Sequence, residues 1–197
     1  MSTAALTAPA SGDGLVRKRW NVADIEAMVA AGILNEKDRL ELIDGELIEM
    51  SSKGIAHEVL KDDLAEFIYA NRPSDVRLTP ETTFRLADNE FLEPDFVFRP
   101  ADMPLAQISG PTVLLVIEIA DSSLAFDRGR KAQRYAHFGV RDYWVIDAKS
   151  LETHIHRSPA PTGYQHVATV GPNEQLTPLL FDTFSFRLAD VTGSTPM

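Results

Sequence analysis

One uninterrupted apolar stretch, TVLLVIEIA at residues 112–120, constrains the fold of this chain more than any other feature. A strand with one solvent-facing side alternates polar and apolar residues, whereas a strand covered on both faces is apolar throughout. Its core, Val113–Ile117, has the length of a strand, and no apolar run in the sequence approaches the length of a membrane span. The stretch therefore predicts a central strand with helices on both faces of its sheet, and Glu118 lies near its end.

Helical periodicity predicts three helices in the rest of the chain. Apolar residues recur at helical spacing, with capping or breaking residues at the ends, in 21–32, 54–73 and 122–139. The second of these is the clearest amphipathic helix, and we expect its apolar stripe to face the core. The stripe consists of Ile55, Val59, Leu60, Leu64, Phe67 and Ile68.

Turn residues and short apolar runs predict the strands. Asp44-Gly45 lies between two strand-like runs, which predicts a hairpin over residues 40–50. Residues 76–89 predict a strand pair or one interrupted strand, and residues 90–100 predict a strand that is entered through Pro94. Further strands are expected at 141–148, 151–157, 164–170 and 184–188. This order indicates one α/β (α+β) domain over residues 20–190, with a central mixed sheet flanked by helices and extra C-terminal strands. We expect residues 1–19 to form a flexible N-terminal tail and 191–197 a loose C-terminal tail.

Composition narrows the classes of function. The chain has no cysteine, which excludes disulfides and thiolate metal sites and is compatible with a reducing compartment. Its formal net charge of −10 weighs against a protein whose main task is to coat nucleic acid. It does not exclude an enzyme that contacts few phosphates through a metal ion. The N-terminus lacks the pattern of a secretory signal, so a cytoplasmic location without membrane contact is expected.

Two acids at strand ends are the first candidate for chemistry. Asp95 follows Pro94 at the start of one predicted strand, and Glu118 lies late in the next. If the two strands pair, both carboxylates come to one place, and carboxylate oxygens with waters are what Mg²⁺ prefers. The alternative is that Glu118 only leaves the sheet at its polar end, while Asp95 marks a loop-to-strand junction.

A lysine on the third predicted helix is the second candidate. Lys131 shares a helix face with Tyr135 and Phe138, which are expected to face the sheet. Lys131 therefore lies on the buried stripe, where its ammonium reaches the space beside Glu118. A structural pair with Asp127, one turn earlier, is the alternative explanation, and Asp127 is also placed to steady the lysine.

Four motifs in order resemble those of a known family: LELIDGELIEMSSKGIAHEVL, EPDFVF, LLVIEIADSS and FDRGRKAQRYAHFGVRDYWVID. The chain resembles the Uma-type restriction endonuclease family of the PD-(D/E)XK nuclease superfamily, from about Trp20 to Asp147 and more weakly to Leu188. The resemblance implies a restriction-endonuclease-like core. Within it, Asp95 and Glu118 match the two acids of the superfamily motif, and Ala120 stands where the superfamily lysine usually does.

The resemblance also implies roles for these residues. Asp95 and Glu118 would bind Mg²⁺ or Mn²⁺, and Lys131 matches the lysine that the resembled family places on the following helix. Glu46 and His57 match two further recurrent positions. Their alternatives are a surface acid of a hairpin, and a histidine at a helix start that is hydrogen-bonded to backbone.

Three functions from different classes remain open. The resemblance implies a Mg²⁺-dependent DNA endonuclease, which would act as a homodimer because cleavage of both strands needs two sites. The second is a catalytically weak or inactive nuclease-fold module that binds nucleic acid or protein, and the third is a structural protein whose acids form salt bridges. His154 and His156 share one face of a predicted strand. Two histidines on one face could bind a metal ion, but no third metal ligand is evident nearby in the sequence, so we expect that face to be solvated.

Overall fold

The computed structural model describes residues 17–35 and 37–192, which form two compact units. Unit 1 contains the residues up to Met50 together with Ala87–Phe91, and unit 2 contains Ser51–Leu86 and the residues from Leu92 onward. Most of the predicted N-terminal tail and residues 193–197 of the predicted C-terminal tail lie outside the described residues. Among the described residues, no helix combines the length and apolarity needed to cross a membrane.

Unit 1 holds a short helix and a hairpin. Its elements are α1 (Val22–Ala30), β1 (Leu40–Ile43), β2 (Glu46–Glu49) and most of β5 (Glu90–Leu92). The predicted helix cap is confirmed, because Asn21 and Asp24 form a reciprocal capping box at the start of α1. Asp44 and Gly45 both have positive φ, 52° and 73°, as the predicted tight hairpin turn requires.

Unit 2 carries the larger sheet and the remaining helices. Its helical elements are α2 (Ile55–Asn71), η1 (Leu105–Gln107), α3 (Leu124–Phe126), the π-helical turn η2 (Asp127–Lys131), α4 (Ala132–His137) and α5 (Leu188–Thr192). Its strands are β3 (Val76–Pro80), β6 (Phe96–Pro100), β7 (Leu115–Ala120), β8 (Asp142–Asp147), β9 (Thr153–Ala160) and β10 (Gly163–Val170), with β4 (Phe84–Ala87) leading into the hairpin with β5.

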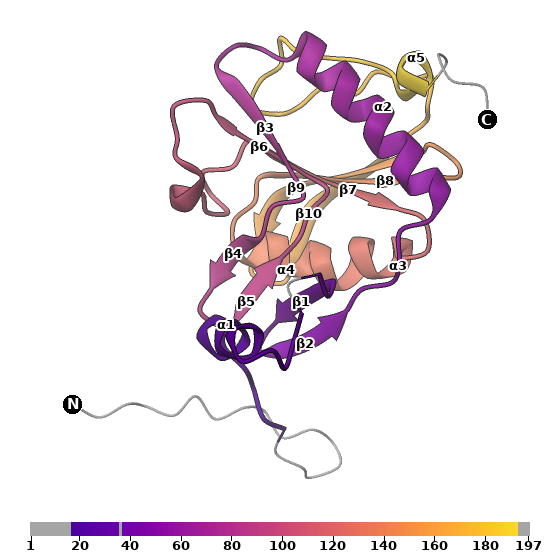
Figure 1. Cartoon of the computed structure of the whole chain (residues 1–197). Coiled ribbons are helices and arrows are strands. Elements are labelled where there is room, and N and C mark those ends of the chain that lie inside the picture. The colour runs from indigo at the N-terminus through magenta and orange to yellow at the C-terminus, as the bar shows by residue number, and fades with distance from the viewer. Residues whose placement is uncertain (1–16, 36, 193–197) are drawn as a thin grey trace. The chain divides into compact units, whose positions relative to one another are not determined.

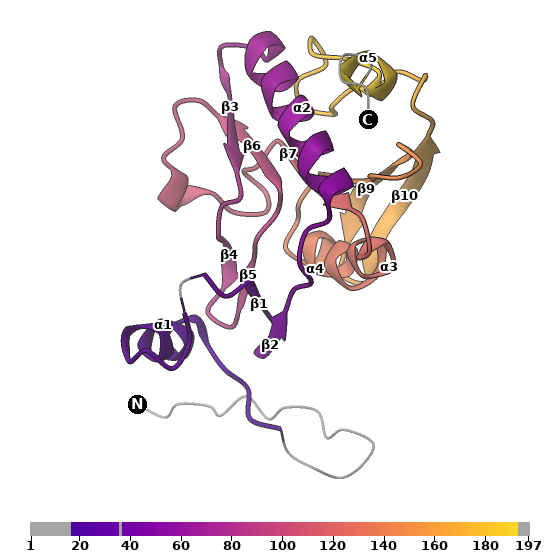
Figure 2. The same ribbon diagram turned by 45° about the vertical axis from the view of Figure 1, so that its right-hand side comes forward.

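The six-stranded sheet has the order β10-β9-β8-β7-β6-β3. Only β7 and β8 run parallel, joined by the α3–η2–α4 segment, so the sheet is mixed as predicted. All six residues of β7 are buried. Figure 1 shows why, since α2 crosses one face of the sheet while α3 and α4 cover the other. Figure 2 shows that α5 lies beside α2 on the same face.

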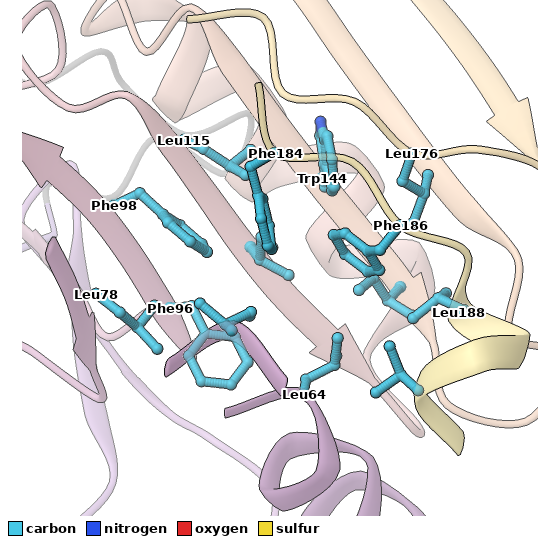
Figure 3. Close-up of a cluster of buried hydrophobic side chains, with 14 of the residues drawn as sticks. Leu64, Leu78, Phe96, Phe98, Leu115, Trp144, Leu176, Phe184, Phe186 and Leu188 are labelled. Atoms are coloured by element: carbon cyan, nitrogen blue, oxygen red, sulfur yellow. The ribbon is translucent and has the colours of Figure 1, made fainter. Parts of the chain in front are cut away.

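The main core lies between the sheet and α2. Leu60, Leu64 and Ile68 of α2 pack on the strands, and the segment that leads into α5 adds further aromatic and aliphatic side chains (Figure 3). Burial of these side chains provides the main stabilisation of unit 2. Two residues of the predicted stripe are outside the core, because Ile55 is 82 % exposed and Val59 37 %. The buried stripe consists of His57, Leu60, Leu64 and Ile68, and at about 100° per residue Ile55 and Val59 lie on the opposite side of α2.

The strand predicted to be entered through Pro94 is β6, and the residues before the proline form the separate strand β5. The predicted helix 122–139 is helical from Leu124 to His137, with the π turn η2 as an irregularity that was not predicted. One other prediction of local structure is wrong. The predicted strand 184–188 forms only an isolated bridge between Leu176 and Phe186, because aromatic residues there pack into the core instead of extending a ladder.

Candidate active site

Asp95 lies where the chain enters β6, directly after the proline that separates the two strands. The ladder between β6 and β7 includes the pair Phe96↔Ile117, so one further step of this register sets Asp95 opposite Glu118. The Asp95 carboxylate is 3 % exposed, and its Oδ2 accepts a hydrogen bond of 2.8 Å from the backbone N–H of Ile119. This bond fixes the carboxylate beside the end of β7, next in sequence to Glu118.

Two cationic or polar side chains from the start of α2 contact the same carboxylate. The Lys53 Nζ lies 2.9 Å from Asp95 Oδ1, and the His57 Nε2 lies 3.0 Å from Oδ1 and 3.1 Å from Oδ2. Gly54, between them, has no room for a side chain, since an added Cβ would lie 2.0 Å from an oxygen of Asp121. The close approach at Gly54 holds the segment that carries Lys53 against the end of β7.

These contacts keep Asp95 ionised. Burial of the carboxylate opposes ionisation, but the hydrogen bond from His57, the charge of Lys53 and the Ile119 N–H together lower the pKa of Asp95 to about 2. A buried carboxylate is tolerated only when it is paired and hydrogen-bonded. Asp95 is therefore available as an anionic ligand at every pH in the physiological range.

Glu118 has a separate set of partners, which come from η2 and α4. Its Oε1 accepts hydrogen bonds from Lys131 Nζ at 3.1 Å and from the Tyr135 hydroxyl at 3.0 Å. Glu118 and Lys131 are 4 % and 2 % exposed, and Tyr135 is fully buried. The predicted approach of Lys131 to Glu118 is present, and Asp127 Oδ1 lies farther from the ammonium, at 3.6 Å.

The π turn explains how Lys131 reaches this place. In η2 the N–H of Ala132 bonds back to the carbonyl of Asp127, five residues earlier. The same carbonyl accepts a hydrogen bond of 3.0 Å from the Tyr143 hydroxyl of β8. A second acceptor role for the Asp127 carbonyl makes this irregular turn stable, and both Asp127 and Lys131 are buried in it.

A charged network extends from Lys53 to the surface. Glu81, in the turn after β3, accepts from Lys53 at 2.6 Å and from Lys61 at 2.9 Å. Lys61 also pairs with Glu58 at 2.9 Å. The hydrogen bonds from Lys53 and Lys61 lower the pKa of Glu81 to about 2. Lys53 therefore bridges a buried carboxylate, Asp95, and a half-exposed one, Glu81.

The structure places some of the predicted site residues together and one of them elsewhere. It brings His57 to Asp95 and Lys131 to Glu118. His57 thus bonds a carboxylate, not backbone as its alternative assumed. Glu46 lies in unit 1, where its carboxylate pairs with Arg19 at 3.0 Å, and its predicted role stays a prediction.

Two contacting residues were not foreseen from the sequence. Lys53 stands in the polar segment between a hairpin and a helix, where no periodicity assigns a direction to its side chain. Tyr135 was assigned to the apolar stripe of its helix, and its hydroxyl gave no sequence signal. Its burial is the one clue, because a buried tyrosine hydroxyl normally has a hydrogen-bond partner.

The prediction for the strand histidines is wrong. His154 and His156 are each 4 % exposed, so their face of β9 is not solvated. His154 Nδ1 bonds the Thr169 hydroxyl, and the ring of His156 packs on Tyr143 and Tyr164. Burial lowers the pKa of both histidines, which keeps them neutral as packing residues.

The donors at the strand ends suit one type of metal binding. Residues 17–35 and 37–192 contain no cluster of three or more His, Asp or Glu side chains arranged to hold a metal ion. Mg²⁺, however, commonly binds one or two carboxylates and completes its shell with water and phosphate oxygens. Asp95 and Glu118 are buried carboxylates at neighbouring strand ends, which is the type of donor that this mode uses. Their present hydrogen bonds engage different partners, Lys53, His57 and the Ile119 N–H for Asp95, and Lys131 and Tyr135 for Glu118.

Comparison with known proteins assigns the chain to a family. A family model described as "Uma2: Putative restriction endonuclease" matches residues 22–189. The chain belongs to the Uma2 family. No curated protein matches it. The Uma2 assignment confirms the resemblance seen in the sequence motifs.

A solved structure shares the fold. It is described as the crystal structure of "a putative nuclease belonging to DUF820" from Anabaena variabilis ATCC 29413, and it has a TM-score of 0.66 and 14 % sequence identity. The match covers 83 % of this chain and 95 % of the other. At this identity the likeness shows the fold alone, and it confirms the predicted restriction-endonuclease-like core.

Proposed function

We propose that this chain is a Mg²⁺- or Mn²⁺-dependent DNA endonuclease that hydrolyses phosphodiester bonds. The observation that carries the proposal is the pair of buried carboxylates, Asp95 and Glu118, at neighbouring strand ends with Lys131 on Glu118. Membership of a family described as restriction endonucleases and the shared nuclease fold support the same activity.

Different residues of the chain would bind the ion, stabilise charge and position the carboxylates. Asp95 and Glu118 would hold the ion together with the carbonyl of Ile119, the residue that follows Glu118. A bound divalent ion would lower the pKa of a water and offset charge on the phosphate. Lys131 would stabilise the charge that develops on the phosphate or orient the water. His57 and the Ile119 N–H hold the Asp95 carboxylate in one orientation, and Tyr135 does the same for Glu118.

A plasmid assay tests this function. Supercoiled DNA is incubated with Mg²⁺ or Mn²⁺ and with the wild type, Asp95→Asn, Lys131→Ala or Lys149→Ala. The first two substitutions are expected to lower the rate at least about a hundredfold. Lys149 is a matched control, because it is an exposed lysine that pairs with Asp121. Equal rates in all four proteins, or a rate that EDTA leaves unchanged, would reject the proposal.

A second function rests on one specific observation. Each carboxylate already has a lysine partner, Lys53 for Asp95 and Lys131 for Glu118, and Ala120 stands at the usual lysine position. These pairs favour a nuclease-fold module that binds DNA or protein without cleaving. In a gel-shift assay, that module would bind DNA with equal affinity with and without Mg²⁺, and plasmid would stay intact.

We propose that the endonuclease acts as a homodimer, since cleavage of both strands at one site needs two active sites. Light scattering on the purified chain measures this directly. A mass of twice the 21.8 kDa chain is expected at micromolar concentration. A monomer that nicks one strand of plasmid and never linearises it would contradict the homodimer while leaving the chemistry intact.

A further inference from the structure

The two lysines at the candidate site differ in how they are held. The Lys131 side chain is 3 % exposed and lies in a helical turn that packs on the sheet. The Lys53 side chain is 17 % exposed and lies in an irregular segment before α2. Motion of the Lys131 ammonium requires a change in a packed helix, whereas motion of the Lys53 ammonium requires only new side-chain rotamers.

The Asp95 carboxylate has limited room for another partner. A carboxylate offers about four lone-pair positions, and Ile119 N–H, His57 Nε2 and Lys53 Nζ already use three or more, because His57 contacts both oxygens. A divalent ion would need an oxygen of Asp95 with its lone pair directed outward. An ion that binds Asp95 directly therefore competes with the donors that are already present.

Lys53 is the donor that yields most easily. The Ile119 N–H belongs to the backbone of a central strand, and His57 is buried in the first turn of α2. A cation of higher charge also repels the ammonium from the same carboxylate. Lys53 and the metal ion therefore compete for Asp95 Oδ1.

Glu81 determines where the displaced ammonium remains. Its Oε1 lies 2.6 Å from Lys53 Nζ, and its backbone N–H bonds the Asp95 carbonyl at 3.1 Å, which ties the Glu81 turn to the site. An ammonium that leaves Asp95 keeps this second carboxylate partner. Two of its three N–H donors are then available to an anionic group next to the metal.

We propose that Lys53 is an exchangeable counter-cation of Asp95. It yields the carboxylate to the metal ion, stays on Glu81, and binds a phosphate oxygen of the DNA. This proposal rests on the proposed endonuclease function. Ala120 is uncharged where related nucleases usually have a lysine, and Lys53, in the segment before α2, would provide part of the missing positive charge. Lys53 thereby couples metal binding to substrate binding.

Calorimetric titration of Mn²⁺ without DNA tests the exchange independently of activity. Lys53→Met removes the competing charge, so it is expected to bind Mn²⁺ about tenfold more tightly than the wild type, which corresponds to about 1.4 kcal/mol. Lys61→Met is the matched control, because Lys61 shares Glu81 but does not contact Asp95, and we expect its affinity to stay within about twofold of wild type. Lys53→Arg keeps the charge and is expected not to bind more tightly.

DNA binding tests the second half of the proposal. In Ca²⁺, which is expected to support binding without cleavage, Lys53→Met should bind a short duplex about tenfold more weakly than Lys61→Met, through loss of one phosphate contact. Circular dichroism confirms that each variant is folded, and Lys53→Gln replaces Lys53→Met if the latter is not.

The outcomes separate this proposal from the function on which it rests. If the wild type binds Mn²⁺ and cleaves DNA, but Lys53→Met binds Mn²⁺ no more tightly, the exchange is wrong and the endonuclease stands. If the wild type neither binds Mn²⁺ nor cleaves, both proposals fail. Tighter Mn²⁺ binding together with unchanged DNA affinity would overturn the phosphate contact of Lys53, and with it the coupling of metal binding to substrate binding.

Discussion

Asp95 and Glu118 are the same kind of group at neighbouring strand ends, yet the protein stabilises them in different ways. Glu118 is held by two side chains of one helical segment, both almost fully buried. Asp95 is held by a backbone N–H, a histidine and a partly exposed lysine. The difference indicates that the Glu118 pair is a fixed part of the fold, while the Asp95 pair can be exchanged. Substitutions at the two pairs test this distinction.

The largest loss of stability is expected at the Glu118 pair. Lys131→Met leaves a buried carboxylate without its cation, and such changes cost about 3–5 kcal/mol. Urea denaturation measures this as a large drop in the unfolding midpoint. The double variant Lys131→Met/Glu118→Gln should recover part of the loss, because Glu118 then carries no charge, while the buried Asp127 still lacks the ammonium 3.6 Å away. A loss under about 1 kcal/mol for the single variant would show that Glu118 is exchangeable too.

Acid titration tests the Asp95 pair. The pKa of Asp95 is about 2 in the fold against 3.8 for a free side chain, so its ionised form favours the folded state. This contribution is complete above about pH 5 and is lost as pH falls from about 5 toward 2. It amounts to about 2 kcal/mol. Urea midpoints measured between pH 6 and pH 2.5 should therefore fall less steeply for Asp95→Asn than for the wild type.

A matched variant at Glu81 separates the contribution of Asp95 to acid stability from that of the surface network. Glu81 also has a pKa of about 2 and titrates in the same range. Its side chain is 53 % exposed, so solvent screens its interactions and Glu81→Gln should flatten the acid curve less than Asp95→Asn does. A larger effect at Glu81 would mean that the surface network, not the buried carboxylate, determines acid stability.

The sequence predicts the Glu118–Lys131 pair better than the Asp95–Lys53 pair. Glu118 and Lys131 follow from a continuous apolar strand and from the stripe of the next helix, because both patterns reflect burial in a regular element. Lys53 does not follow, because its direction depends on the tight approach at Gly54, which is a tertiary contact. Irregular segments carry no period from which a side-chain direction can be inferred.

The differences between the predicted and the observed structure have the same origin. The π turn is stabilised by the Tyr143 hydroxyl, which reaches it from a strand that follows later in the chain. The burial of His154 depends on Thr169 of the neighbouring strand β10. Ile55 is apolar and has helical spacing to Val59, but the buried stripe of α2 passes through the polar His57 instead, and the apolar pattern gives no sign of that.

Tyr135 gives a smaller test of the Glu118 pair. Tyr135→Phe removes a hydroxyl donor to a buried charge without changing the packing of the ring, and a loss of about 1.5 kcal/mol is expected. Tyr164→Phe is the control, since the Tyr164 hydroxyl donates to the neutral carbonyl of Val140 at 2.9 Å. Tyr164→Phe should lose less stability than Tyr135→Phe, and thermal unfolding of the two variants measures the difference. Equal losses would mean that Tyr135 is not a special partner of Glu118.

The smallest loss of stability is expected at Lys53. After Lys53→Met, Asp95 keeps the Ile119 N–H and His57, and Glu81 keeps Lys61, so neither carboxylate is left alone. The lost pair is partly exposed, and its contribution is expected to be about 1 kcal/mol or less. Urea denaturation of Lys53→Met beside Lys131→Met then measures the difference between the pairs. A loss at Lys53 as large as that at Lys131 would make Lys53 a structural residue and would remove the basis for its exchange with a metal ion.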